Sequence, residues 1–219
     1  MRSSALRALG AYLNVFSIES FMDELAASVD EDPVAYRLRH LSDERARAVL
    51  QTATSAAGWE RPVEDGIGRG VGLARYKDRG AYCAVVAEVA AEHDVSVRKL
   101  TIAVDVGRVV NPDGVLNQIE GGATQATSWT LKERVRFDRT RVTSDDWESY
   151  PILRFSEVPE IDVHLLDRPH LPSVGAGEAA QGPTAGAIGN AVAAALDVRV
   201  RDLPLTYDAV VAAIEADEH

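Results

Sequence analysis

The sequence contains a single cysteine, Cys83, among its 219 residues. One cysteine cannot form a disulfide within the chain, and it cannot supply the thiolates of an iron–sulfur cluster or of a cysteine-rich zinc site. The 5 histidines do not compensate, because none is spaced three or four residues from another as a helical zinc motif requires. We therefore expect no zinc or iron site built from protein ligands, and a packed thiol at Cys83.

Basic residues and long apolar runs are also scarce. Lys and Arg number 23 against 34 Asp and Glu, which gives a net charge of −11. A field of that sign repels nucleic-acid phosphates and anionic lipid. The apolar stretches are interrupted well short of the roughly 20 residues that a membrane span needs. Near the amino terminus, Asn14 interrupts the one stretch that follows basic residues, and acids come directly after it. The sequence thus predicts a cytoplasmic protein without an export signal that binds neither nucleic acid nor membrane.

The pattern of apolar residues predicts an α+β fold, a mixed α/β domain with β-hairpins and packed helices. We expect one region over residues 1–219, helical over 1–60 and mixed α/β over 66–219. The first helix is expected to be amphipathic, with an apolar side that includes Ile18 and with its acids on the opposite side.

Helix boundaries in the first third follow from capping residues. Asp32-Pro33 predicts a helix start, and Ser42 is expected to cap a further helix that ends at Gly58. In the later part of the chain, segments rich in β-branched residues are predicted to be strands, and segments rich in Ala and other small residues are predicted to be helices. The expected strands are 71–77, 82–91, 97–106 and 160–166, the expected helices 112–130, 183–196 and 207–216, and the expected hairpins turn at 93–94 and within 135–142.

Alternating glycines at 66, 68, 70 and 72 superficially suggest a dinucleotide-binding loop. That fingerprint follows a strand and opens a helix, whereas these glycines follow a helix and open a strand. We interpret them as a flexible lead into the strand.

A glycine-rich segment over 173–182 surrounds one carboxylate, Glu178, and leads into a helix of small residues at Gly182-Pro183. Exposed N–H groups of such a backbone and a helix N-terminus favour anions. A carboxylate shielded from water at this place would have a raised pKa and could act as a general base. The alternative is a loop with an exposed Glu in front of a packing helix.

A second cluster of small and polar residues covers 117–125. Gln118 and Gln125 lie seven residues apart, so on a helix they share one face. Their uncharged amides are suited to hydrogen bonding with a heteroatom-rich cofactor. Ordinary polar helix positions, with glycines for close packing, explain the same pattern.

Together with Arg7-Ala8-Leu9-Gly10 and the stretch 105–114, these two segments resemble the molybdenum-binding subunit of the xanthine dehydrogenase and aldehyde oxidase family. The similarity is closest to the bacterial branch that hydroxylates nicotinate, isoquinoline and related heterocycles or aldehydes. It extends from about residue 2 to residue 210, and it corresponds to the carboxy-terminal, cofactor-binding part of much longer subunits.

The resemblance implies a molybdopterin cofactor that holds the metal without protein ligands. Glu178 would be the base that removes a proton from the attacking oxygen, which comes from water, and the substrate would be an N-heterocycle or an aldehyde. Gln118 would hydrogen-bond a ligand of the metal, and Gly177 would let the cofactor approach. The remaining cofactor contacts implied by position are Gly175, Ala176 and Arg7.

The glycine-rich segments that hold the cofactor from its other side in this family are absent from the sequence. The resemblance therefore implies a separately encoded molybdopterin-binding half, a 2Fe–2S subunit that carries the iron–sulfur clusters, and a flavin or cytochrome subunit as a further partner. An isolated chain is expected to self-associate through the surfaces left exposed.

Two other hypotheses remain open from the sequence. One is a non-catalytic scaffold or interaction subunit, or a fragment, that retains the fold without turnover. The other is a hydrolase that uses Glu178 and a second acid, although the sequence suggests no convincing partner carboxylate.

Overall fold

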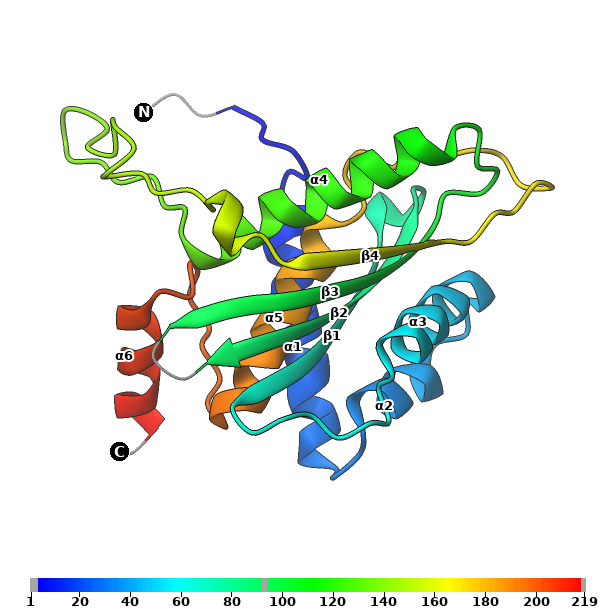
Figure 1. Ribbon diagram of the computed structural model, residues 1–219, viewed down its shortest axis with the longest axis horizontal. Coiled ribbons are helices and arrows are strands. Elements are labelled where there is room, and N and C mark those ends of the chain that lie inside the picture. Colours follow the sequence, from blue (N-terminus) through cyan, green and yellow to red (C-terminus); the bar gives the residue numbers. More distant parts are fainter. Residues whose placement is uncertain (1–3, 92–93, 218–219) are drawn as a thin grey trace.

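The centre of the molecule is a four-stranded β-sheet (Figure 1). The computed structural model describes residues 4–91 and 94–217, and the sheet is formed within these residues. Its strand order is β1 (Ile67–Arg75), β2 (Tyr82–Ala91), β3 (Val95–Asp105) and β4 (Glu160–Leu165). The first three strands are antiparallel, and β4 is parallel to β3. A parallel neighbour requires a crossover, which contains α4 (Pro112–Leu131).

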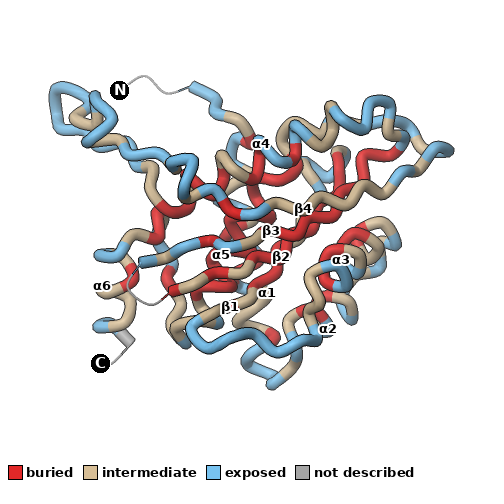
Figure 2. Tube along the Cα trace, viewed as in Figure 1, coloured by how far each residue is buried: buried red, intermediate tan, exposed pale blue. Residues whose placement is uncertain are grey.

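Helices cover both faces of the sheet. On one face α3 (Glu44–Ala57) packs with α2 (Pro33–His40), and on the other lie α4 and α5 (Gln181–Leu196), with α1 (Ala11–Ser28) outside α5. The last helix, α6 (Tyr207–Asp217), lies beside one end of the sheet. Side chains of β2 alternate between the two cores, as the two-residue period of a strand requires. Val85 packs in the core with Ile188 of α5, and Val86 packs in the core with Leu50 of α3. The predicted mixed α/β class is confirmed, and Figure 2 shows the buried segments gathered at the centre.

The glycines of β1 let α5 approach the strand backbone. A Cβ at Gly68 would lie 1.9 Å from the carbonyl oxygen of Ala191, and one at Gly72 would lie 2.2 Å from that of Pro183. No side chain fits at such distances. The interpretation as a flexible lead into the strand is therefore wrong for Gly68, Gly70 and Gly72, which form a packing surface within a regular strand, whereas Gly66 precedes β1 with φ at 77°.

The opposite side of α5 makes a similar contact with α1. A Cβ at Gly182 would lie 2.8 Å from the Val15 Cβ, and one at Gly189 would lie 2.6 Å from the Phe16 ring. Helix α5 is consequently held between β1 and α1, and residues 181–192 are all buried.

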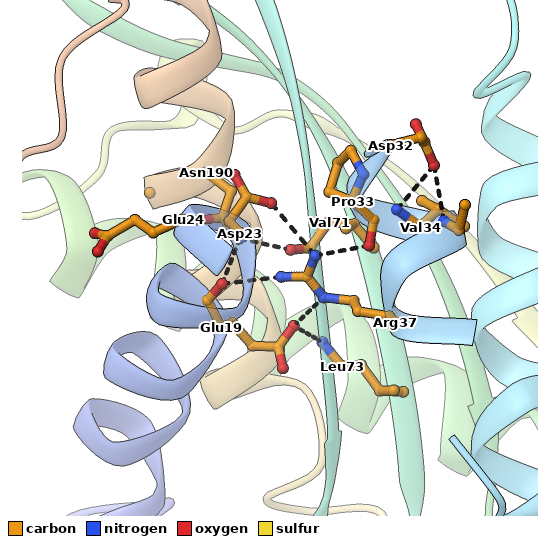
Figure 3. Close-up of polar contacts among 12 residues, drawn as sticks. Glu19, Asp23, Glu24, Asp32, Pro33, Val34, Arg37, Val71, Leu73 and Asn190 are labelled. Carbon is orange, nitrogen blue, oxygen red and sulfur yellow. Dashed lines mark hydrogen bonds and ion pairs between the residues drawn. The ribbon is translucent and has the colours of Figure 1, made fainter. Parts of the chain in front are cut away.

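A buried ion pair joins α1, α2 and β1 (Figure 3). Arg37 of α2 is 2% exposed, and its Nε donates to the Glu19 carboxylate at 2.9 Å. The backbone N–H of Leu73 in β1 donates to the same carboxylate oxygen at 3.1 Å. The predicted orientation of α1 is wrong here, since Glu19 is buried while Ile18 is 57% exposed. Burial of Glu19 requires the charge of Arg37, which the pattern of α1 alone does not contain.

Most predicted element boundaries agree with the structure. Asp32 caps α2, where its Oδ1 accepts from the Val34 N–H at 2.9 Å, and Gly58 ends α3 in the left-handed conformation at φ 64°. The cap of α3 is Asp43 rather than Ser42, because the Asp43 carboxylate accepts from the first backbone N–H groups of the helix. The hairpin predicted within 135–142 is reduced to one bridge between residues 137 and 142. The predicted turn at 93–94 includes residue 93, which lies outside the described residues.

Two further expectations concern single features. Cys83 is fully buried, and burial raises the pKa of its thiol to about 12, which confirms a packed and unreactive cysteine. Across residues 4–91 and 94–217, no helix is both long and apolar enough to cross a membrane.

Gly70→Ala is expected to destabilise the fold by about 3 kcal/mol or more, because overpacking against backbone cannot relax by a rotamer change. Its Cβ would lie 2.1 Å from the backbone nitrogen of Ala191. The matched control is Gly121→Ala on α4, where a Cβ meets nothing within 4 Å. Alanine there raises helix propensity by up to about 1 kcal/mol. Chemical denaturation measures both effects, and wild-type stability of Gly70→Ala would contradict the close contact of β1 and α5.

Candidate functional site

The predicted site residues meet at the amino-terminal end of α5. Arg7 lies just before α1, Gln118 lies on α4, and Gly177 lies in the loop that leads into α5. The Arg7 guanidinium connects all three segments. Its Nε donates to the Gly177 carbonyl oxygen, and its Nη2 donates to the Gln118 carbonyl oxygen at 3.0 Å.

Amides of α4 complete the surroundings of this arginine. Arg7 Nη2 lies 3.3 Å from Gln118 Oε1, and Arg7 Nη1 lies 3.4 Å from Gln125 Oε1. The prediction that these two glutamines share a helix face is therefore confirmed. Gly122 lies between them along the helix, and a Cβ there would lie 2.9 Å from the end of the Gln181 side chain and 3.4 Å from Arg7 Nη2. The absence of a side chain at Gly122 thus makes room for the Gln181 amide and the Arg7 guanidinium.

Sequence reasoning missed Gln181, the first residue of α5, which is fully buried. With its amide turned so that the oxygen faces the guanidinium, Gln181 shares the single Arg7 Nε–H with the Gly177 carbonyl oxygen, at an N···O distance of 2.6 Å, and its amide nitrogen donates to the Glu178 carbonyl oxygen at 3.1 Å. Its place three residues after Glu178, inside the glycine-rich segment, is the signal that could have indicated it.

The Glu178 carboxylate is half-buried and bound from the segment before α1. Its Oε1 accepts from the Ala8 backbone N–H at 2.9 Å. Ala8 and Leu9 have φ angles of 73° and 52°, in the left-handed region that costs an ordinary residue roughly 1–2 kcal/mol. This strained turn directs the Ala8 amide toward the carboxylate, and such strain often accompanies functional sites.

The pKa of Glu178 is lowered in this structure, whereas the expected rise applies to a carboxylate shielded from water. The Tyr76 hydroxyl beside it, the Ala8 amide and the positive charges of Lys77 and Arg7 lower the pKa of this carboxyl, against the opposing effect of partial burial. The expectation considered burial only, whereas the groups that surround Glu178 favour its charged form. The charges acting on it are cationic, which does not match the paired carboxylates of the hydrolase hypothesis.

Gly175 and Ala176, the other two residues predicted to contact the cofactor, differ in how far they are buried. Gly175 is exposed, and a Cβ there would meet nothing within 4 Å. Ala176 is half-buried and packs against the main core, and its carbonyl oxygen accepts from the Ala179 N–H at 3.3 Å. Ala176 therefore anchors the loop, whereas Gly175 lies on an open surface.

A buried aspartate holds the stretch that precedes this loop. Asp105, at the end of β3, is fully buried and accepts from Arg45 at 3.0 and 2.6 Å and from Arg168 at 3.2 Å. The Val174 N–H donates to the Val106 carbonyl oxygen at 2.9 Å, which continues the attachment to the end of β3. These contacts attach the start of the loop to the end of β3, and none of them involves the Glu178 carboxylate.

The donors at the site suit an anionic cofactor rather than a bare metal ion. Within the described residues, no group of three or more His, Cys, Asp or Glu could hold a metal. A guanidinium and three side-chain amides instead lie beside one carboxylate, and Gly175 of the same loop has open space where a Cβ would stand. Such a set can bind a heteroatom-rich, negatively charged group that brings its own metal ligands, and molybdopterin is a group of this kind.

Comparison with known proteins agrees with this chemistry. The family model described as "Molybdopterin cofactor-binding domain" matches residues 24–159. The chain is 43% identical to a nicotinate dehydrogenase subunit from Pseudomonas putida, over 98% of this chain and 20% of that protein. It is 36% identical to the beta subunit of isoquinoline 1-oxidoreductase from Brevundimonas diminuta, over 91% of this chain and 26% of that protein.

Solved structures show a similar fold. The aldehyde oxidoreductase from Desulfovibrio desulfuricans superimposes with a TM-score of 0.79 at 16% identity, over 95% of this chain and 41% of that one. The chain thus spans about a fifth to a quarter of the curated relatives named above.

Asp105→Asn is expected to lower the free energy of unfolding at neutral pH by about 2 kcal/mol, the scale of hydrogen bonds to charged groups. Although burial acts to raise the pKa of Asp105, hydrogen bonds from Arg45, the Gly107 amide and Arg168 together lower it. A lowered folded pKa gives stability that is present above the unfolded value, about 4, and is lost as the pH falls.

Denaturation at several pH values measures this effect. The difference between wild type and Asp105→Asn should be constant from neutral pH to about 5 and should shrink below about 4. Asp65→Asn, at an exposed position, serves as the control. A difference that grows on acidification would contradict the ionised, arginine-bound state of Asp105.

Proposed function

Because this chain belongs to the molybdopterin cofactor-binding domain family, we propose that it forms one side of the active site of a molybdenum hydroxylase. The substrate class that we propose is an N-heterocycle or an aldehyde, with water as the source of oxygen. The names of the relatives support it, since they act on nicotinate and isoquinoline.

The observation that carries this proposal is the position of the Glu178 carboxylate. It lies among cationic groups, held by the Ala8 amide, and next to the cluster of Arg7, Gln118 and Gln181. A carboxylate that is ionised before the substrate arrives can accept a proton at its free oxygen, which is the requirement for a general base.

Bound molybdopterin would supply a redox-active metal as the acceptor of an electron pair. The residues of this chain hold and orient that cofactor and move the proton. Arg7 contributes positive charge, and the amides of Gln118 and Gln125, whose oxygens accept from Arg7, would offer their NH2 groups to the cofactor as donors. Glu178 accepts the proton, and the exclusion of water by cofactor and substrate would strengthen its basicity at that moment.

We propose that the enzyme is assembled from several subunits. The relatives are named as subunits, and the chain corresponds to only part of each. A molybdopterin-binding half and a 2Fe–2S subunit would supply the missing cofactor contacts and the iron–sulfur clusters, and a flavin or cytochrome subunit could take up the electrons. Apolar side chains on α1 that are more than half exposed, Leu13, Ile18 and Phe21, fit an interface with such a half. We place the assembly in the cytoplasm.

In the assembled enzyme, Glu178→Gln should lower kcat and kcat/KM by about 10⁴-fold or more, the top of the range for general-base catalysis. Glutamine keeps the acceptor for the Ala8 amide but does not take up a proton at neutral pH. Molybdenum content should stay near the wild-type value, and Glu160→Gln, on the exposed edge of β4, should leave turnover unchanged. Retention of more than about a tenth of wild-type activity at full occupancy, far outside that range, would favour the scaffold hypothesis.

The chain purified without its partners is expected to contain far less than one molybdenum per chain and to show no iron–sulfur absorbance. The reason is that the residues proposed to contact the cofactor would hold it from one side only. Elemental analysis and visible absorbance measure both quantities, with the co-expressed assembly as the comparison. Near-equimolar molybdenum in the isolated chain would contradict the need for a second half.

A further inference from the structure

Strand β1 and helix α5 pass each other in a fixed register. A Cβ at Gly68 would meet the Ala191 backbone, and a Cβ at Gly72 would meet the Pro183 backbone. Four residues along the strand, at about 3.3 Å each, thus match eight along the helix, at about 1.5 Å each. Four residues further, just beyond the end of β1, Tyr76 comes level with the loop that precedes α5. This loop carries the candidate base.

The backbone at Tyr76 is fixed by the tight connection between β1 and β2. Its N–H donates to the Ala81 carbonyl oxygen at 3.0 Å, and its carbonyl oxygen accepts from the Gly80 N–H at 2.8 Å. Lys77 adopts a left-handed conformation with φ at 47°, and its Nζ lies 5.0 Å from the centre of the Tyr76 ring. The Lys77 side chain therefore lies over the Tyr76 ring, and the hydrogen bonds of the turn fix the backbone that carries this ring.

The Tyr76 hydroxyl is the unexplained feature of this turn. Its oxygen is buried, and the described residues offer it no partner in good hydrogen-bond geometry. A buried hydroxyl without a partner costs about 1–3 kcal/mol. The register of β1 and α5 brings Tyr76 level with the loop that carries Glu178, and the two groups shift the pKa of each other, which agrees with this placement. A small movement of that carboxylate would provide the missing acceptor.

We propose that Tyr76 is a positioning residue for Glu178, whose hydroxyl donates to the carboxylate and holds it toward the cofactor side of the site. Its functional importance rests on the proposed role of Glu178 as the base, while the contact itself does not. Ala8 binds the carboxylate from the segment before α1, and Tyr76 binds it from the β1–β2 connection. Two donors from separate parts of the fold would fix its direction.

The charges around Glu178 determine the sign of the expected effect. Lys77 from the β1–β2 connection and Arg7 from the segment before α1 both favour the carboxylate, and Tyr76 adds a neutral donor. Tyr76→Phe removes this donor and leaves both cations in place. The pKa of Glu178 should then rise, because its charged form loses a hydrogen bond.

The direct test is a titration of the Glu178 side chain by ¹³C NMR in the full chain, with its resonance assigned by its loss in Glu178→Gln. The midpoint should rise by about one pH unit in Tyr76→Phe, a typical effect of one hydrogen bond to the charged form. The control is Tyr150→Phe, which removes a similar bond of 2.7 Å from Tyr150 to Glu133 beyond the other end of α4. The Glu178 midpoint should not move in this control.

In the assembled enzyme, the acidic limb of the kcat/KM profile should move upward by the same amount in Tyr76→Phe. At pH values below the midpoint of the wild-type acidic limb, kcat/KM of Tyr76→Phe should be about tenfold lower than kcat/KM of wild type. As the pH rises above the limb, kcat/KM of the variant should reach the wild-type value. A merely structural role for Tyr76 would lower activity at every pH. Tyr150→Phe should keep the wild-type profile.

An unchanged Glu178 midpoint in Tyr76→Phe would overturn the inference, even if Glu178→Gln abolishes turnover. A raised midpoint together with an active Glu178→Gln enzyme would support the contact and reject the proposed base. The reciprocal measurement covers a poorly folded Tyr76→Phe variant. In Glu178→Gln the Tyr76 phenol should titrate at lower pH than in wild type, and an unchanged phenol would equally overturn the inference.

Discussion

The contact between the backbones of β1 and α5 is the constraint on which the rest of the structure depends. A strand and a helix usually keep a layer of side chains between them, but here alternate glycines remove that layer. The helix then lies so deep that its other side can receive α1 in the same way, at Gly182 and Gly189. Every residue from 181 to 192 is buried as a result. A helix with so little freedom is a rigid support for what is attached to its end.

The candidate site is attached to that end. The loop with Glu178 enters α5 directly, Arg7 precedes the helix that packs on α5, and Tyr76 follows the strand that packs on α5. Three segments distant in sequence converge because each is continuous with one partner of the same packed unit. The buried pair of Arg37 and Glu19 also stabilises the packing of α1, α5 and β1, because it joins α1 to β1 and to α2. Removal of one partner would leave the other charge buried without compensation.

Local patterns were sufficient to predict most helices, most strands and the two polar clusters, because capping residues and periodicity act over a few residues. Nonlocal effects were not predictable in this way. Glu19 is buried because Arg37, 18 residues away, neutralises it. The β1 glycines are explained only by a helix more than a hundred residues later in the sequence. The pKa of Glu178 is lowered by Tyr76 and Lys77, which no pattern in the loop reveals.

The site is complete on one side and open on the other. Below the loop, Arg7 and Gln181 satisfy the backbone carbonyl groups, and Ala176 packs into the core. Gly121 on α4 and Gly175 in the loop, in contrast, have no atom within reach of an added Cβ. Glycine in the interior of a helix costs about 1 kcal/mol relative to alanine, so Gly121 at an exposed position of α4 is not explained by packing within this chain. A flat, heteroatom-rich group lying against the loop and α4 would explain both glycines, because only a surface without side chains lets such a group approach the backbone.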